Sequence, residues 1–162
     1  MTEQPTSETI AQMHHWFAVE CNNSCWNLMY KADRTPEDDR DLLYRAYAAA
    51  YHWSYAGTPL NGARAALTLA NVHSQLDHSD LALHYAQLSL DYFENNDCED
   101  WDLAFGHAAM AYAAAVSGDA DLHAKHYIEA KRRGEAIANE IDRTIFMESF
   151  NQVPTEVIRR SL

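Results

Sequence analysis

The chain has 162 residues, and its 12 Lys and Arg against 24 Asp and Glu give a formal net charge of −12 at pH 7. This length predicts a single domain, spanning 1–162, that buries its own core without a metal or a disulfide. The acidic balance disfavours nucleic acid as a partner, because binding to phosphates depends on Lys and Arg.

The cysteines, the N-terminal residues and one uncharged run bear on where the chain is located. Cys21, Cys25 and Cys98 are an odd number at irregular spacing, which favours a reducing environment over a disulfide framework. Residues 1–7 lack the basic flank and the apolar stretch of a secretory signal. The uncharged run 103–116 is too short to cross a bilayer. We therefore expect a cytoplasmic protein with no membrane partner.

Capping residues predict the first three helices. Ser7 or Thr6 caps a helix that runs to about Tyr30, after a flexible N-terminus over 1–6. The pairs Thr35-Pro36 and Thr58-Pro59 place a cap before a proline that suits the first helical position, so they open the second and third helices.

Turn residues predict four further helices, which makes about seven in all. A turn at 77–79 ends the third helix, and 95–97 ends the fourth. Gly118-Asp119 separates the fifth from the sixth, which runs to about Asn139. Asp142 is expected to cap a shorter seventh helix that ends before Pro154, with 153–162 as a C-terminal tail.

Apolar residues recur at helical spacing, as expected for the core faces of helices. The helix that ends at Gly118 is small or apolar nearly all round, so we expect it to lie at the centre, packed on several sides. Two further stripes are predicted to be core, one in the first helix and one in the second: Ile10, Met13, Phe17, Cys21, Ser24 and Leu28; and Tyr44, Tyr47, Tyr51 and Tyr55.

A short motif occurs twice, 42 residues apart. Ala82-Leu83-His84-Tyr85 matches Ala124-Lys125-His126-Tyr127, whereas the turns at Asp77 and Gly118 align at 41, so the register stays open between 41 and 42. A repeat of this length is typical of stacked helix pairs, which bury their apolar faces only against neighbouring pairs.

These positions resemble the tetratricopeptide repeat family over about 60–138. In that family small residues lie where paired helices cross, as Ala70 and Ala82 do in one set and Ala111 and Ala124 in the other. The whole chain is also similar to uncharacterised bacterial proteins of this repeat-like type. The resemblance implies an all-α fold of antiparallel helical hairpins stacked as a short α-solenoid, and a role in binding a protein or peptide.

If the family pattern carries over, the first helix of each pair lines the binding groove. The contact residues are then Arg64, Leu67, Asn71, Gln75, Phe105, Ala108 and Tyr112. No Lys or Arg occurs from 65 to 124 although ten acids do, so we expect an acidic groove and a cationic partner, unless these acids are only solvated helix faces. Homodimerisation is a further possibility, because short solenoids expose unpaired faces at their ends.

The alternative function is a pocket for a small molecule or a metal between the second and third helices. Arg45 and Arg64 lie in alanine-rich, aromatic-rich helices, where a guanidinium needs a partner. That partner is either a bound anion or planar group, or an internal acid such as Asp41. The candidate pocket residues are Arg45, His52, Trp53, Asn61, Arg64 and His73.

Signatures of catalysis and of cofactors are missing. The five glycines form neither a phosphate-binding loop nor a dinucleotide fingerprint, and no His-x-x-x-His occurs, so a non-enzyme without a cofactor is favoured. The best remaining metal candidates are Asp119, His123 and His126, which share a predicted helical face but are equally compatible with solvated side chains.

Overall fold

The computed structural model describes residues 4–158, and within these residues it contains seven α-helices and no strand. The prediction of an all-α fold is therefore confirmed. The helices are α1 Ser7–Met29, α2 Pro36–Ala56, α3 Pro59–Gln75, α4 Ser79–Asn95, α5 Asp100–Ser117, α6 Ala120–Glu135 and α7 Glu140–Phe150.

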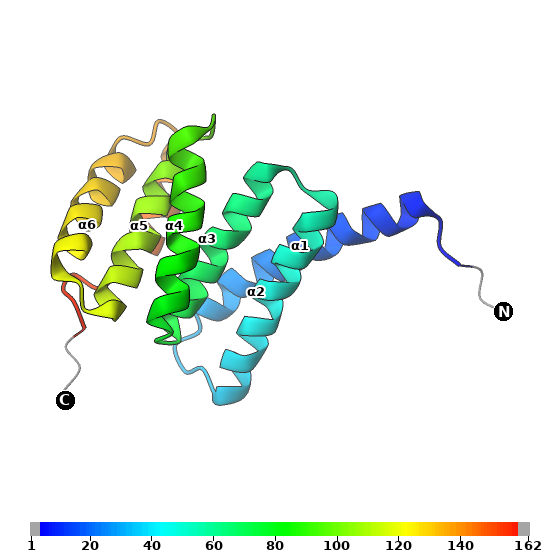
Figure 1. Cartoon of the computed structure of the whole chain (residues 1–162), viewed down its shortest axis with the longest axis horizontal. Helices are drawn as coiled ribbons and strands as arrows, with labels where there is room; N and C mark the ends of the chain where they lie inside the picture. The colour runs from blue at the N-terminus through cyan, green and yellow to red at the C-terminus, as the bar shows by residue number, and fades with distance from the viewer. Residues whose placement is uncertain (1–3, 159–162) are drawn as a thin grey trace.

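The helices form a row of helical hairpins. α1 packs on α2, α3 on α4 and α5 on α6, and each pair packs against the next, as in an α-solenoid (Figure 1). α7 returns to pack on α5 and α6, where the ring of Phe146 leaves no room for a Cβ on Gly134. The N-terminal end of α1 projects away from the row (Figure 1).

The helix starts follow from local capping. Thr35 and Thr58 each accept a hydrogen bond from a backbone N–H of the first turn, and a proline occupies the first helical position in both helices, as predicted. Thr6 caps α1 in the same way. The prediction for α7 is wrong in detail: the cap is Asn139, because α6 already ends at Glu135.

α5 lies at the centre of the fold, as predicted. Twelve of its 18 residues are buried, and it packs on α3, α4, α6 and α7. Its alanines, including Ala104, Ala109 and Ala113, let these helices approach closely from several sides.

The structure sets the repeat register at 41 residues. Asp77 and Gly118, 41 residues apart, both have left-handed backbone, with φ of 61° and 83°. Ala82 on α4 is buried and so is His123 on α6, again 41 residues later, whereas Ala124 is exposed. Pairing Ala82 with Ala124 as crossing sites is therefore wrong, because one further residue rotates a side chain by about 100° around a helix.

The predicted core stripes of α1 and α2 are largely exposed, so that prediction is wrong. Tyr44 is 67% exposed and Tyr55 66%, and from Ser7 to Phe17 no residue of α1 is buried. Periodicity shows that a helix has an apolar face but does not show that a neighbouring element covers it.

Both predicted end segments contribute contacts where they are described. In the N-terminal segment, Thr6 caps α1. Val153 is buried, and the backbone N–H of Ile158 donates to the carbonyl of Ala115 at 2.9 Å, so this part of the predicted tail packs on the hairpins. Residues 1–3 and 159–162 lie outside the described part.

Between residues 4 and 158, no helix combines the length and the apolar character needed to cross a membrane.

Candidate functional groove

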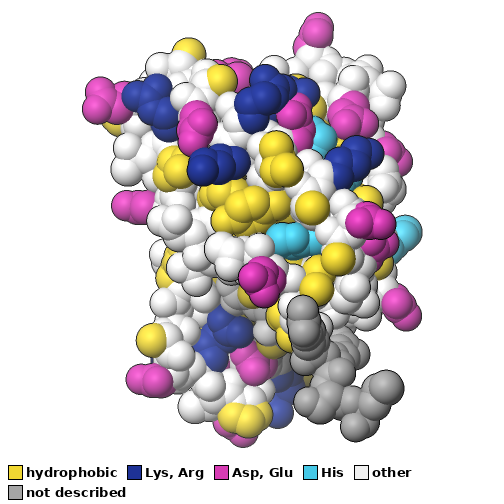
Figure 2. All heavy atoms as spheres, turned by 90° about the vertical axis from the view of Figure 1, so that its left-hand side faces the viewer, with side chains coloured by type: hydrophobic (Ala, Val, Ile, Leu, Met, Phe, Trp, Pro, Cys, Tyr) yellow, Lys and Arg dark blue, Asp and Glu magenta, His cyan; other side chains and the backbone are white. Residues whose placement is uncertain are grey.

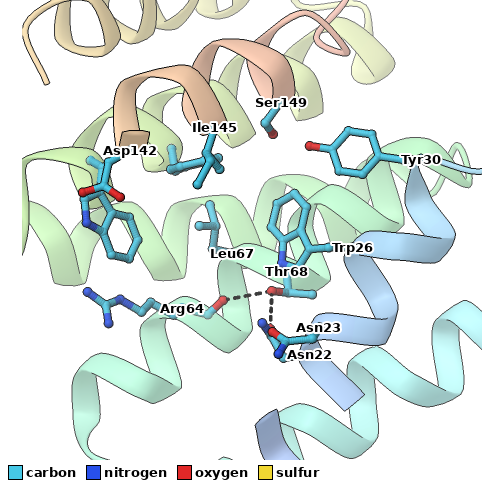
Figure 3. Close-up of a pocket in the computed structure, with 12 residues that line it drawn as sticks. Asn22, Asn23, Trp26, Tyr30, Arg64, Leu67, Thr68, Asp142, Ile145 and Ser149 are labelled. Atoms are coloured by element: carbon cyan, nitrogen blue, oxygen red, sulfur yellow. Dashed lines mark hydrogen bonds between the residues drawn. The ribbon is translucent and has the colours of Figure 1, made fainter. Parts of the chain in front are cut away.

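A groove opens on one side of the row, between α1 and α7. It encloses a cavity of about 400 Å³ with α3 and α5 at its base. Figure 3 shows side chains of α1, α3 and α7 pointing toward one another across it. The lining residues are Asn22, Asn23, Trp26, Tyr30, Arg64, Leu67, Thr68, Trp101, Phe105, Asp142, Ile145 and Ser149.

Aromatic rings dominate this surface. The ring of Phe105 meets Trp26 and Trp101 edge to face, with 6.2 Å between the ring centroids in both cases. Edge-to-face pairs are a favoured geometry of aromatic rings, so these contacts help to orient the rings that line the groove. Tyr30 and Ile145 remain 47% and 52% exposed at the two walls, and are available to a partner.

Arg64 is held in place by a buried carboxylate. Its Nε and Nη2 donate to the two oxygens of Asp102 at 2.8 Å each, and its guanidinium lies over the ring of Trp101 at 4.3 Å. The hydrogen bonds to Asp102 raise the pKa of Arg64 above its ordinary value. Asp102 is fully buried and accepts both hydrogen bonds, so it holds the guanidinium of Arg64 at the edge of the groove.

Polar side chains beside the aromatic rings form a second strip. The hydroxyl of Thr68 lies 2.9 Å from Oδ1 of Asn22 and 3.2 Å from the carbonyl of Arg64 (Figure 3). Asn23 is exposed, and Figure 3 marks no hydrogen bond between it and the other lining residues, so its amide can donate and accept at the groove surface.

Six of the seven residues predicted for the groove lie along it. Arg64, Leu67 and Phe105 line the main cavity. Three more line a narrow cleft that continues it and shares Trp26, Tyr30 and Ser149 with it: Asn71, Gln75 and Tyr112. Ala108 is the exception, because it is buried in a cluster with Ile137 and Phe146.

Sequence reasoning missed the two walls of the groove. Trp26 and Tyr30, four residues apart on one helical face, were a usable signal, but α1 lies outside the repeat-like region from which the groove was predicted. No local pattern indicates that α7 folds back over α5, so Asp142, Ile145 and Ser149 could not be assigned.

The charge of the groove differs from the charge of the chain. Asp142 is the one carboxylate among its lining residues, and Arg64 is the one cation. Two of the acids counted in the sequence, Asp80 and Asp91, instead line a more open hollow on α4 and its neighbours. The groove is thus better described as aromatic than as acidic.

The alternative pocket residues have separate partners inside the fold. Arg45 pairs with Asp41 at 2.6 Å, which is the internal ion pair considered above. His52 meets His14 at 2.8 Å between their Nδ1 atoms, and Asn61 completes the cap of α3. Trp53 lies edge to face with His15, at 5.4 Å.

His73, the remaining member of that set, is buried between α2 and the turn after α3. Its Nε2 lies 3.0 Å from the hydroxyl of Tyr47, and its Nδ1 lies 3.0 Å from Nδ1 of His78. Burial, with a smaller effect of His78, lowers the pKa of His73 to about 4. Of the six predicted pocket residues, Arg64 alone lines the groove.

The three metal candidates also point to different partners. Asp119 caps α6 by accepting from the N–H of Leu122, and Nε2 of His123 donates to the carbonyl of Pro154 at 2.8 Å. His126 meets His107 at 2.9 Å between their Nδ1 atoms. Over residues 4–158, no group of three or more His, Cys, Asp or Glu side chains is placed to hold a metal ion.

Comparisons of the chain with models of protein families, with curated proteins and with solved structures gave no match.

Proposed function

We propose that this chain is an interaction module, similar in kind to tetratricopeptide repeat proteins, that binds a segment of a protein or peptide partner in the groove between α1 and α7. The observation that carries the proposal is the open, aromatic-lined cavity built from the first helices of the three hairpins and from α7. Its mechanism is binding without chemistry, in keeping with the absence of catalytic signatures in the sequence.

The lining supports a partner segment with an apolar or aromatic anchor residue. Trp26, Trp101 and Phe105 offer flat apolar surface, and aromatic side chains contribute most to affinity when they enclose an anchor in a preformed pocket. Asn22, Asn23 and Ser149 place amides and a hydroxyl beside these rings, where they can pair with polar groups of a bound backbone. Asp142 favours a basic residue next to the anchor, so a cationic partner is compatible with the groove.

Selection from a display library of random linear peptides tests the proposal. Peptides selected on the wild-type chain should bind Ile145→Ser at least about tenfold more weakly, because the substitution removes exposed apolar surface from one wall. Ile128→Ser is the matched control, since Ile128 is 68% exposed on α6 and lies outside the groove. Peptides that bind wild type and Ile145→Ser equally well would contradict the proposal, as would a selection without enrichment.

The size of the cavity favours a second candidate, a small organic ligand in the same groove. Small-molecule sites typically have volumes of about 300–1,000 Å³, a range that includes the 400 Å³ of this cavity. A thermal-shift screen of aromatic compounds tests this candidate, because a ligand that binds only the folded state raises the melting temperature. The rise should be lost in Trp26→Ala if the ligand occupies the groove.

A further inference from the structure

We propose that a second copy of this chain packs on the outer face of the α1–α2 hairpin, so that the protein is a homodimer. This terminal face consists of Ile10, Met13, Trp16 and Phe17 on α1 and Tyr44, Tyr51 and Tyr55 on α2, whereas Tyr47 faces His73 and Tyr85 of the next hairpin. It is separate from the groove, whose α1 residues lie nearer the C-terminal end of that helix.

The side chains of the terminal face form one continuous surface across the two helices. His14 stacks on Tyr55 with 4.7 Å between ring centroids, and Phe17 stacks on His52 at 5.4 Å. Trp16 lies edge to face with Phe17 at 4.9 Å. These contacts connect the exposed side of α1 to the row of tyrosines along α2.

The first part of α1 has too few buried side chains to hold it in place without a partner. From Ser7 to Phe17 no residue is buried, and this segment projects from the row (Figure 1). Isolated helices shorter than about 12–15 residues are marginal in water, so most helical stability must come from packing on an apolar face. A covering partner supplies that packing for Ile10, Met13 and Phe17.

The exposed area matches what a dimer needs. The exposed fractions of the seven side chains range from 37% for Phe17 to 67% for Tyr44. With about 200 Å² for each large side chain, they expose on the order of 750 Å² together. A stable protein–protein interface buries about 800 Å² on each partner, so this one face is sufficient.

The charge distribution favours a second copy as the partner. The chain carries a net charge of −12, so two copies repel each other through most of their faces. Residues 9–19 and 46–63, which include most of the terminal face, contain no Asp, Glu, Lys or Arg. The polar groups on and beside the terminal face include tyrosine hydroxyls and the rings of His14 and His52, which can donate and accept hydrogen bonds, so two identical faces can satisfy each other. The α6 end of the row, by contrast, shows charged side chains of both signs (Figure 2).

Sedimentation velocity over a concentration series tests the dimer. We expect wild type to sediment at twice the mass of the 18.4 kDa chain. Trp16→Glu and Tyr55→Glu should each raise the Kd of the dimer at least about 100-fold, because each places like charges opposite each other in the interface. Raising the salt concentration should leave the wild-type dimer intact, since no attraction between charges holds it.

The controls separate loss of the dimer from loss of the fold. Trp16 and Tyr55 are 60% and 66% exposed in the single chain, so circular dichroism of both variants should match wild type. If either variant loses helix, Tyr51→Glu replaces it, since Tyr51 is 56% exposed on the same face. Ile128→Glu on α6 should remain a dimer. A monomeric wild type, a dimer that survives substitution of the terminal face, or a dimer that Ile128→Glu dissociates would overturn the proposal.

Discussion

The α1–α2 hairpin, here called the terminal hairpin, and the α3–α4 and α5–α6 hairpins, here called the inner hairpins, are built from similar residues but are buried very differently. α1 buries three of its 23 residues and α2 three of its 21, whereas α3 buries ten of 17 and α5 twelve of 18. The α3–α4 hairpin has a hairpin on each side, and α5–α6 packs on α3–α4 and on α7, whereas α1–α2 has a neighbour on one side alone. The comparison teaches that stability and the fixed groove base come from the inner hairpins, while the terminal hairpin supplies one groove wall and a free face.

The largest expected effect is acid destabilisation of the inner hairpins. Burial lowers the pKa of His73 and of His107 to about 4 in the folded state, from an ordinary value of 6.5, with neighbouring histidines adding to the effect. The unfolded chain therefore binds protons that the folded chain excludes, so stability present above pH 6.5 is lost progressively as the pH falls toward 4. The loss is on the order of 3 kcal/mol for each histidine.

Urea denaturation at a series of pH values measures this effect. His73→Gln and His107→Gln should each flatten the fall in unfolding free energy between pH 6.5 and 4, whatever they do to stability at pH 7. An unchanged slope in both variants would show that these buried histidines do not set the acid sensitivity. It would also remove one difference between the inner and terminal hairpins.

The next prediction compares two ion pairs, Arg64–Asp102 and Arg45–Asp41. Arg64→Ala should destabilise by about 3 kcal/mol, because it leaves the fully buried Asp102 without its partner. Arg45→Ala in the terminal hairpin should cost less than about 1 kcal/mol, because the side chains of Arg45 and Asp41 are 37% and 48% exposed and lie four residues apart on one helix. Chemical denaturation of both variants measures the difference, and equal losses would show that burial of Asp102 does not decide the energetics.

A smaller effect tests whether the repeat register of the inner hairpins is 41 or 42 residues. Ala82→Leu should cost about 2 kcal/mol, because Ala82 is fully buried where α4 meets its neighbours. Ala124→Leu should change stability by less than about 0.5 kcal/mol, because Ala124 is exposed. Thermal unfolding compares the two variants. Similar losses would restore the 42-residue pairing and contradict the 41-residue register.

Local signals in the sequence were sufficient for much of the fold. Thr35-Pro36 and Thr58-Pro59 mark helix starts because capping and proline geometry act within one turn of the chain. The alanines of α5 indicated its central place, because a helix that is small on all sides has no face suited to water. The resemblance to the tetratricopeptide repeat family suggested Arg64, Leu67 and Phe105 as groove residues, and these three line the main cavity.

The remaining features depend on which elements meet in space. Tyr44 and Tyr55 have the spacing of core residues, yet no helix covers them, and the sequence does not state what lies opposite a face. Asp102 could not be assigned as the partner of Arg64, because the two are 38 residues apart and meet only after α3 and α5 pack together. The α7 wall of the groove was missed for the same reason.

The four tryptophans allow one measurement to test the groove directly. Trp26 and Trp101 line it, whereas Trp16 and Trp53 lie on the terminal hairpin outside the groove. We therefore propose to follow the four indole N–H signals by nuclear magnetic resonance while adding a library-selected peptide to the 15N-labelled chain. The account predicts that the signals of Trp26 and Trp101 shift and saturate together while those of Trp16 and Trp53 stay in place. Saturable shifts confined to Trp16 and Trp53 would contradict it.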